Sequence, residues 1–488
     1  MGRVMAVDIG ASSYRVIEGI YSDERLSMRV LARFKHEPVM ENGHYRWDVF
    51  GIVHNLTEVL WEAAREGEPV ISIGFDTFGT DFGLLDKEGK LIEKPIAYRD
   101  SISSGICEKY FQDDSRLYSR IGGNFSGACT ASILKGMRET GHIPLKDAER
   151  LLLLPDLMAY LFTGKMVNEV TIATTSRLLN IGKRSWDYEL IEKLGIPGKI
   201  FGPLSEAGSS AGRLKPEISQ GIPNLRNTEV ILAACHDTAS AVSILPQRKA
   251  CSFISSGTWS VKGIVCDSPY RSEMACRYEM ANEGQPGGKY RLIRNITGLW
   301  LVEECVRSWK KEGNILEIPE IAEQASGKGT FPSVIDVDAP DFAEMGDMPG
   351  KIRRFCRRTG QKVPDTPVDV MQAIVQGLAC EYRRHNEQLK DVTGEKIDTI
   401  YIVGGGRNNR YLNRCTADVT GCRVIAGHSE ATAVGNLLIQ LWAAGEVASM
   451  EEFPRIVGKN MKEEVYLPKC HKEWEAMYSF YIGNLKKG

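Results

Sequence analysis

The chain has 488 residues, a length that accommodates two or three domains, each with a substantial hydrophobic core. Its 61 lysine and arginine residues nearly balance 63 aspartate and glutamate residues, which gives a formal net charge of −2. That balance leaves no chain-wide positive field to hold a nucleic acid or an anionic membrane, so we expect neither as a partner. Its apolar runs, such as that at residues 151–154, are far shorter than a membrane span.

The N-terminal residues and the cysteines predict a cytoplasmic protein. Asp8 interrupts the apolar stretch that a secretory signal would need, and no small-residue cleavage site follows it. Twelve cysteines are scattered between Cys107 and Cys470 without a Cys-x-x-Cys pair, which favours reduced thiols over a disulfide framework or a zinc site. We expect most of them to be small hydrophobic residues of the core.

Residues 4–17 form the first recognisable element, a pattern of strand, turn and strand. Between Asp8 and Arg15 the turn combines a carboxylate, a glycine, two hydroxyls and an arginine, which are groups suited to holding phosphate. Gly10 allows close backbone approach, Arg15 can neutralise charge, and Asp8 can hold a hydrated magnesium ion. Taken alone, the turn is explained equally well as a tight polar hairpin with a surface arginine.

Further along the chain, short apolar segments alternate with helical patterns, which is typical of an α/β protein. Apolar residues after Asp48 recur at helical spacing, and Asp48 is expected to cap that helix. A second helix is expected after Thr366, with a proline in its first turn and an aspartate that completes a capping box. The clearest strands are expected at residues 70–75, 229–234 and 399–403.

The segment 234–241 contains the sharpest candidate for chemistry. His236 and Asp237 stand together where an apolar strand ends and small helix-forming residues begin. A carboxylate in this position suits a general base that accepts the proton of a hydroxyl while its oxygen attacks phosphorus. The alternative is that Asp237 only caps the following helix.

A polar break at residues 245–249 predicts a domain boundary, with one domain at 1–245 and the other at 246–488. Directly after the break, residues 251–262 repeat the pattern of strand, turn and strand, which suggests a duplicated fold. Thr258 in this second turn is the best further candidate for a phosphate contact.

Three glycines, at positions 404–406, end the strand predicted at 399–403, where bare backbone could lie against a flat purine ring. Tight packing is the alternative explanation of these glycines. The sequence contains no Walker A loop, no Gly-x-Gly-x-x-Gly after a strand and no His-Glu-x-x-His. A nucleotide site would therefore be assembled from separated turns.

Taken together, the motifs resemble the FGGY family of carbohydrate kinases in order and spacing over nearly the whole chain. The first set consists of residues 8–13, 236–238, 256–260 and 404–406. Further similar segments are residues 75–82, 97–100, 154–156, 235–241 and 295–300.

This resemblance implies an α/β fold with two actin-like, ribonuclease-H-like domains flanking a catalytic cleft, the second ending in a helical tail. It implies transfer of the terminal phosphoryl group of ATP, with Mg²⁺, to the carbon-one hydroxyl of a small ketose, L-rhamnulose, in L-rhamnose catabolism. Asp237 would be the catalytic base and Asp8 the metal ligand. The implied ATP contacts are Ala11, Ser12, Ser13, Tyr14, Arg15, Thr258 and Gly405, and the implied sugar contacts are Gly79, His236, Asp237, Thr238 and Asn295.

Four features depart from the family pattern. Tyr14 stands where a glycine is expected, so its ring should point away from a nucleotide or the turn should differ. Phe78 replaces an expected tryptophan, and the segment 123–130 differs from the usual sugar-side segment. Glu303 stands where a glutamine is expected near ATP, and because its charge would repel phosphate we expect it to turn to the ribose or to solvent.

Other interpretations stay open at this point. The same phosphate turns would serve a kinase for L-fuculose, L-ribulose or xylulose, with a changed sugar pocket. A non-catalytic sugar or nucleotide sensor would keep the turns but would not need a base such as Asp237. The protein could be a monomer or a homodimer, and an apolar stripe with Trp474 and Tyr481 in the C-terminal tail is expected to pack in the core.

Overall fold

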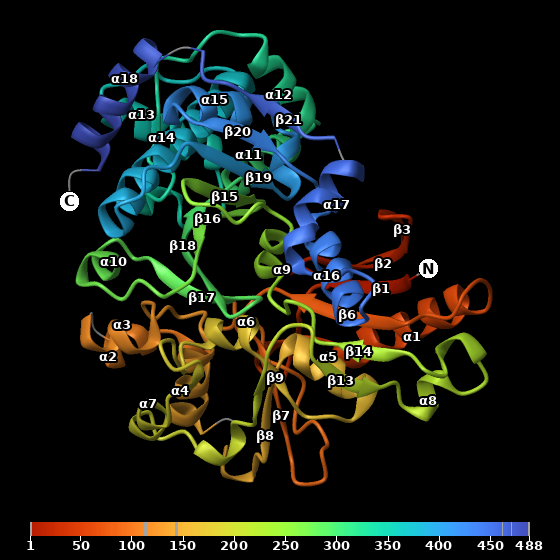
Figure 1. Ribbon diagram of the computed structural model, residues 1–488. Helices are drawn as coiled ribbons and strands as arrows, with labels where there is room; N and C mark the ends of the chain where they lie inside the picture. Colours follow the sequence, from red (N-terminus) through yellow and green to blue (C-terminus); the bar gives the residue numbers. More distant parts are fainter. Residues whose placement is uncertain (1, 112–114, 142–144, 461, 470, 487–488) are drawn as a thin grey trace. The chain divides into compact units, whose positions relative to one another are not determined.

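The computed structural model describes residues 2–111, 115–141, 145–460, 462–469 and 471–486 (Figure 1). They form two compact units. Unit 1 comprises residues 1–245, 265–292 and 432–460, and unit 2 comprises residues 246–264, 293–431 and 461–488. The chain thus divides after residue 245, but the units differ from a simple split into 1–245 and 246–488 because two later segments pack with unit 1.

Unit 1 contains a six-stranded sheet in the order β13-β14-β6-β1-β2-β3 (Figure 1). Strand β1 runs antiparallel to β2 and parallel to β6, and β14 continues the parallel part beyond β6. Both faces of β1 and β6 are buried. The bounds of these strands are β1 Gly2–Ile9, β2 Ser13–Ser22, β3 Arg25–Lys35, β6 Ser72–Thr77, β13 Ser210–Arg213 and β14 Glu229–Ile231.

Helices and small sheets complete unit 1. The helices are α1 Val49–Ala64, α2 Ile106–Tyr110, α3 Ser115–Ile121, α4 Thr130–Thr140, α5 Leu154–Thr163, α6 Val170–Ala173, α7 Tyr188–Lys193, α8 Pro216–Ser219, α9 Asp237–Ser243, α10 Glu273–Arg277, α16 Ala431–Ala443 and α17 Phe453–Asn460. The remaining strands are β4 Val39–Glu41, β5 His44–Arg46, β7 Phe82–Leu85, β8 Arg150–Leu153, β9 Asn168–Glu169, β10 Leu179–Asn180, β11 Ser185–Trp186, β12 Leu204–Ser205 and β17 Ala281–Gln285.

The second large sheet repeats the topology of the first. Its order is β17-β18-β16-β15-β19-β20-β21, in which β15 runs antiparallel to β16 and parallel to β19, and β20 continues the parallel part. An antiparallel strand follows the parallel ones in each sheet, β13 in the first and β21 in the second. The bounds are β15 Cys251–Ser256, β16 Trp259–Cys266, β18 Lys289–Thr297, β19 Thr399–Val403, β20 Arg423–Ala426 and β21 Glu464–Tyr466.

This repetition agrees with the duplicated fold that the two hairpins suggest in the sequence. The helices of unit 2 are α11 Trp300–Lys311, α12 Ile318–Ser326, α13 Met348–Arg358, α14 Pro367–Thr393, α15 Arg410–Thr420 and α18 His471–Phe480. Trp474 and Tyr481 of the C-terminal tail are buried in the core, as expected. None of the helices in the described ranges combines the length and the apolar character that crossing a bilayer requires.

Two helix caps test the sequence predictions. The capping box at the start of α14 is present, since the Thr366 side chain accepts from the amide of Asp369 and the Asp369 carboxylate accepts from the amide of Thr366. Asp48 precedes α1 as predicted, but its side chain makes no capping hydrogen bond, so that part of the prediction is wrong. The carboxylate instead lies 3.4 Å from the ammonium group of Lys94.

The core of unit 2 contains a buried amine. Lys262 on β16 is fully buried, and its Nζ donates to the hydroxyl of Ser252 on β15 at 3.0 Å. Burial lowers the pKa of Lys262 to about 7. His385 on α14 is also fully buried, and burial followed by the charge of Lys262 lowers the pKa of its imidazole well below the usual value.

We expect Lys262→Met to remove a pH dependence of stability. Between pH about 7 and the ordinary lysine pKa of 10.5, the unfolded chain binds this proton and the folded chain does not, so the free energy of unfolding rises with pH. Urea denaturation from pH 7 to pH 9 should show that the variant is more stable than the parent at pH 7, and that the difference shrinks as pH rises. The exposed Lys249→Met variant is the control, and a difference that stays constant or grows with pH would contradict the assignment.

Candidate active site

The carboxyl ends of the parallel strands in unit 1 bring three aspartates together. Asp8 on β1 and Asp76 on β6 are register partners in the sheet. The segment that follows β14 joins the same edge. The amide of Thr77 donates to the carbonyl oxygen of Cys235 at 2.9 Å, and Thr77 pairs with His236 in a parallel bridge. Asp237 follows at once, so the sheet itself places these carboxylates at one edge.

The phosphate-type turn predicted between β1 and β2 is a tight hairpin. The guanidinium of Arg15 donates twice to Oδ2 of Asp8, at 2.9 and 2.6 Å. His36 fastens the turn, with its backbone amide donating to Ser12 at 3.2 Å and its ring nitrogen 2.6 Å from the carbonyl oxygen of Gly10. The predicted groups from Ala11 to Arg15 therefore lie on a fixed loop, with Arg15 already neutralising one carboxylate.

Tyr14 points away from the exposed side of this turn. Its side chain is 2% exposed, stacks on Phe34 at 4.9 Å and accepts a hydrogen bond from Asn55 of α1 at 2.7 Å. A buried ring is consistent with the expectation that it points away from a nucleotide, which stays a prediction. Only the backbone of Tyr14 is left for a ligand at the turn.

Asp76 lies in the segment 75–82 that resembles the family, and the structure makes it central to the edge. It is fully buried, and its Oδ2 accepts from the amide of Asn436 on α16 at 2.5 Å. Gln440, one turn later, donates to Asn436 at 2.6 Å and to the backbone of Met5 at 2.9 Å. The amide side chains of α16 thus hold Asp76 against β1 and β6.

The second oxygen of Asp76 is buried without a hydrogen-bond partner among the described residues. Burial, with the nearby charges of Asp8 and Asp237, raises the pKa of Asp76 well above its usual value. The sequence could not reveal this residue's role, because its partner Asn436 lies 360 positions away. The one feature of the sequence that pointed to Asp76 was a carboxylate near the end of an apolar strand.

Magnesium fits the oxygen atoms at this edge. Mg²⁺ in kinases keeps several waters and binds through one or two carboxylates and the substrate phosphates, rather than in an all-protein cage. Asp8 and the unpartnered oxygen of Asp76 provide such carboxylates. Within the described ranges, no three His, Cys, Asp or Glu side chains form a cage of their own.

His236 and Asp237 stand at the start of α9, where His236 is the N-cap residue and Asp237 begins the helix. The amide of Thr238 donates to Nδ1 of His236 at 3.2 Å, and the hydroxyl of Thr238 donates to Oδ1 of Asp237 at 3.0 Å. Burial lowers the pKa of His236, so the ring is neutral at pH 7. A neutral ring that accepts at Nδ1 carries its proton at Nε2 and can donate there.

Oδ2 of Asp237 makes no hydrogen bond to any part of the chain that the structure describes, and the side chain is 35% exposed. One oxygen is thus oriented by Thr238 and the other is left to accept a proton. This is the arrangement that a general base requires.

The segment after β6 is held in a strained conformation. Thr80 has a φ of 81°, in the left-handed region that a β-branched residue rarely adopts. Two hydrogen bonds hold it there, from its amide to Thr175 at 3.1 Å and from Thr130 to its carbonyl at 2.6 Å. Gly79 packs so closely on Thr175 that an added Cβ would lie 3.1 Å from it. Strain of this kind is common where a ligand binds.

A buried charge cluster beside His236 was missed in the sequence. Glu283 on β17 lies between Arg291 on β18, at 3.2 Å, and Arg177, at 3.5 Å. Arg291 is fully buried, and two of its guanidinium nitrogens have no partner among the described residues. Burial alone would raise the pKa of Glu283, but His236 and the two arginines lower it overall. Charged residues inside an otherwise buried strand were the available signal.

The same cluster contacts the segment 123–130, which departs from the family pattern. Arg177 donates to the backbone of Asn124 at 3.3 Å, and Asn124 donates to Cys276 at 3.3 Å. Phe78, another departure from the family pattern, packs between aromatic rings. Its ring centroid lies 5.4 Å from that of Trp47 and 5.6 Å from that of Tyr98.

In unit 2, the turn between β15 and β16 carries Thr258. The amide of Trp300 donates to the carbonyl of Thr258 at 3.1 Å, which ties the turn to the start of α11. The Thr258 hydroxyl donates to the carboxylate of Glu303 on α11, at 3.2 and 3.4 Å from its two oxygens. Glu303 therefore does not turn to solvent, which was one of its two expected orientations, and the other, towards a ribose, stays a prediction.

The three glycines after β19 differ in whether packing leaves room for a side chain. A Cβ on Gly404, whose φ is 82°, or on Gly406 would meet Ser256 of β15 at 2.8 or 2.0 Å, so both are required by packing. A Cβ on Gly405 would meet nothing within 4 Å, which leaves an open backbone face beside this turn.

Asn295, the remaining residue predicted to contact the sugar, is an exposed residue of β18.

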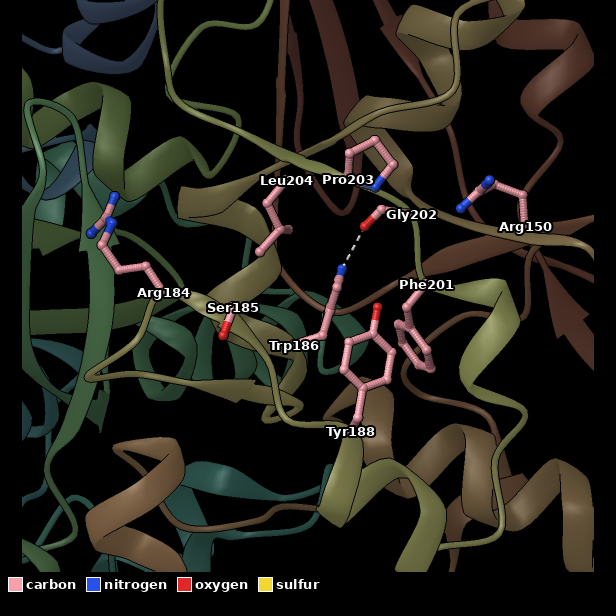
Figure 2. Close-up of a pocket in the computed structure, with 9 residues that line it drawn as sticks. All are labelled: Arg150, Arg184, Ser185, Trp186, Tyr188, Phe201, Gly202, Pro203 and Leu204. Carbon is pink, nitrogen blue, oxygen red and sulfur yellow. Dashed lines mark hydrogen bonds between the residues drawn. The ribbon is translucent and has the colours of Figure 1, made fainter.

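A separate hollow of about 380 Å³ lies in unit 1 and contains none of the predicted site residues (Figure 2). The indole of Trp186 crosses it and donates to the carbonyl of Gly202 at 2.8 Å. Its lining consists of Arg150, Arg184, Ser185, Trp186, Tyr188, Phe201, Gly202, Pro203 and Leu204. It offers neither a carboxylate nor an imidazole for acid–base chemistry.

Comparison with known proteins gives consistent matches. A model of the N-terminal domain of the FGGY family of carbohydrate kinases matches residues 3–243, and a model of the C-terminal domain of that family matches residues 252–444. A rhamnulokinase of Bacteroides thetaiotaomicron is 35% identical over 97% of each chain. A rhamnulokinase of Oceanobacillus iheyensis is 36% identical over 93% of this chain and 96% of its own.

Solved structures show the same fold at low sequence identity. A ligand-bound xylulose kinase of Lactobacillus acidophilus superposes with a TM-score of 0.79 at 13% identity, covering 99% of this chain and 97% of that one. A glycerol kinase of Plasmodium falciparum with ADP gives a TM-score of 0.80 at 15% identity, covering 100% and 98%. The predicted two-domain α/β fold is confirmed.

We expect Glu283→Gln to destabilise unit 1 by about 3 kcal/mol, because removing one partner of a buried ionic cluster leaves the other charges uncompensated. Chemical denaturation at pH 7 measures this loss. Glu273→Gln, which removes the same charge from an exposed pair with Arg277, should change stability little. Equal effects of the two substitutions would contradict the role assigned to the cluster.

Proposed function

We propose that the chain, which belongs to the FGGY family of carbohydrate kinases and is a sugar kinase, phosphorylates L-rhamnulose at carbon one with ATP. The match of both family models supports the reaction class. The rhamnulokinases that are 35% and 36% identical over nearly the full length support the substrate and a place in L-rhamnose catabolism. The observation that carries the mechanism is the free Oδ2 of Asp237 at the edge of the unit 1 sheet.

In this mechanism Asp237 is the general base. As the carbon-one oxygen forms its bond to the γ-phosphorus, the bond from that phosphorus to the β,γ-bridging oxygen breaks and the hydroxyl proton passes to Oδ2 of Asp237. Thr238 holds Oδ1 so that Oδ2 faces the hydroxyl. The neutral His236 donates from Nε2 to a sugar oxygen and adds no positive charge that would compete for the base.

The remaining proposed contacts divide by chemistry. Backbone and hydroxyl groups of residues 11–15 and the hydroxyl of Thr258 would donate to the phosphates, and the open face at Gly405 would accept adenine. Gly79, Thr238 and Asn295 would contact the sugar. Asp8 and Asp76 would hold Mg²⁺, which when bound neutralises phosphate charge.

Two further properties belong to the proposal. The described cysteines form no disulfide, which supports a reducing, cytoplasmic location. We expect the active species to be a monomer or a homodimer, with no nucleic acid or membrane partner.

Asp237→Asn should lower kcat by at least about 10²-fold, since the amide cannot accept the proton, while binding of the sugar changes modestly. Steady-state kinetics with a purified, folded variant, together with direct measurement of sugar binding, separates the two effects. Asp267→Asn, at an exposed position, is the matched control for charge. Near-normal turnover of Asp237→Asn would remove this residue from the mechanism.

The sugar specificity is tested by ADP release with Mg-ATP and a panel of L-rhamnulose, L-fuculose, L-ribulose, D-xylulose, D-ribulose and glycerol. We expect the highest kcat/KM with L-rhamnulose. A higher value with another ketose would keep the mechanism and assign the difference to the altered pocket around Phe78 and Asn124. No activity with any sugar would favour a sensor.

A further inference from the structure

The nucleotide side of unit 2 contains a negative charge that the proposed reaction does not use. Glu303 lies in the first turn of α11, and both of its oxygens face the hydroxyl of Thr258, at 3.2 and 3.4 Å. Thr258 is the residue expected to donate to a phosphate oxygen. In the structure its hydroxyl donates to a carboxylate instead.

Glu303 is held in this place by the local fold. The amide of Leu299 donates to the carbonyl of Gly257 at 3.0 Å, so the β15–β16 turn and the start of α11 are joined by backbone. Gly298 permits the close approach, because a Cβ there would lie 2.6 Å from the backbone of Trp259. The carboxylate therefore stays beside the turn unless its own side chain rotates.

We propose that Glu303 is a charge gate on nucleotide binding: the ionised carboxylate competes with phosphate for the Thr258 hydroxyl and repels the phosphate, so that nucleotide binding requires Glu303 to become neutral or rotate away. This inference rests on the proposed function, since it assumes that Thr258 belongs to the nucleotide site. Glu303 would thereby affect the affinity for the nucleotide and take no part in the phosphoryl transfer.

The surroundings of Glu303 favour uptake of a proton. Burial raises the pKa of Glu303, the hydrogen bond from Thr258 lowers it in part, and among the nearby charges Arg307 lowers it and Glu304 raises it. Arg307 lies 2.6 Å from Glu304, which shares its positive charge. From α13, Arg353 and Asp347 act on the thiol of Cys305, on another face of α11.

The sign of the pH effect follows from linkage. A bound phosphate raises the pKa of a neighbouring carboxyl further, so the complex binds a proton that the free protein has released. Nucleotide affinity therefore falls as pH rises from the pKa of Glu303 in the free protein towards its higher pKa in the complex. A neutral isostere at this position abolishes that dependence.

The test is calorimetric titration of the protein with Mg-ADP between pH 5.5 and 8.5, for the parent and Glu303→Gln. The amide keeps the size and the acceptor for Thr258, so the substitution removes only the charge. We expect Glu303→Gln to bind Mg-ADP at least about threefold more tightly than the parent at pH 8, and we expect this ratio to fall as the pH is lowered. The ratio cancels the ionisation of ADP itself.

Glu312→Gln is the matched control, because it removes the same charge from the exposed C-terminal end of α11. A second measurement compares proton uptake in two buffers of different ionisation enthalpy, and the parent should take up more protons than Glu303→Gln. Equal affinities of parent and Glu303→Gln at every pH, or weaker binding by the variant, would overturn the gate. Binding of Mg-ADP by none of the proteins would overturn both the gate and the nucleotide site, whereas a gate that fails alone leaves nucleotide binding and kinase activity intact.

Discussion

The parallel pairing of β1 with β6 is the constraint on which the account of unit 1 depends. It places Asp8 opposite Asp76 at the carboxyl end of the sheet, and the bridge from Thr77 to His236 adds Asp237 to the same edge. Like charges at a buried edge repel one another, and each loses hydration. The fold offsets this cost with the guanidinium of Arg15 on one side and the amide of Asn436 on the other.

The contribution of α16 explains why unit 1 is not contiguous in sequence. Gln440 binds the backbone of β1 and the hydroxyl of Ser72 on β6, while Asn436 holds the buried carboxylate of Asp76. The amides provide hydrogen bonds inside the core without adding another charge. A segment from late in the chain is thus required to complete the edge that its earliest strand begins.

The two sheets share one topology but present different chemistry at corresponding turns. In unit 1 the turn after β1 follows a carboxylate and is closed by an arginine. In unit 2 the turn after β15 carries a glycine and the hydroxyl of Thr258, and Ser256 at the end of β15 packs on glycines 404 and 406. The contrast agrees with the proposal that unit 1 supplies the base and the metal ligands, whereas the turns of both units supply phosphate contacts.

Local features of the sequence predicted much of this structure. Both hairpins, the strand at 399–403 and the capping box of Thr366 follow from short-range patterns and are present. What could not be predicted depends on distant contacts: the support of Asp76 by Asn436, and the cluster of Glu283 with Arg177 and Arg291. The hydrogen bond from Thr258 to Glu303 was not predicted either, because repulsion by an expected phosphate was considered but the hydroxyl of Thr258 was not.

Transfer to carbon one is tested most directly by phosphorus NMR of the product formed from Mg-ATP and L-rhamnulose, recorded without proton decoupling. Transfer to the carbon-one hydroxyl predicts a new phosphate ester whose signal is split into a triplet by the two protons of the methylene group. A doublet would place the phosphate on a secondary carbon and contradict the assigned acceptor. If the γ-phosphate of ATP appeared only as orthophosphate, the phosphoryl group would have passed to water. That result would contradict the role of Asp237 as the base for a sugar hydroxyl.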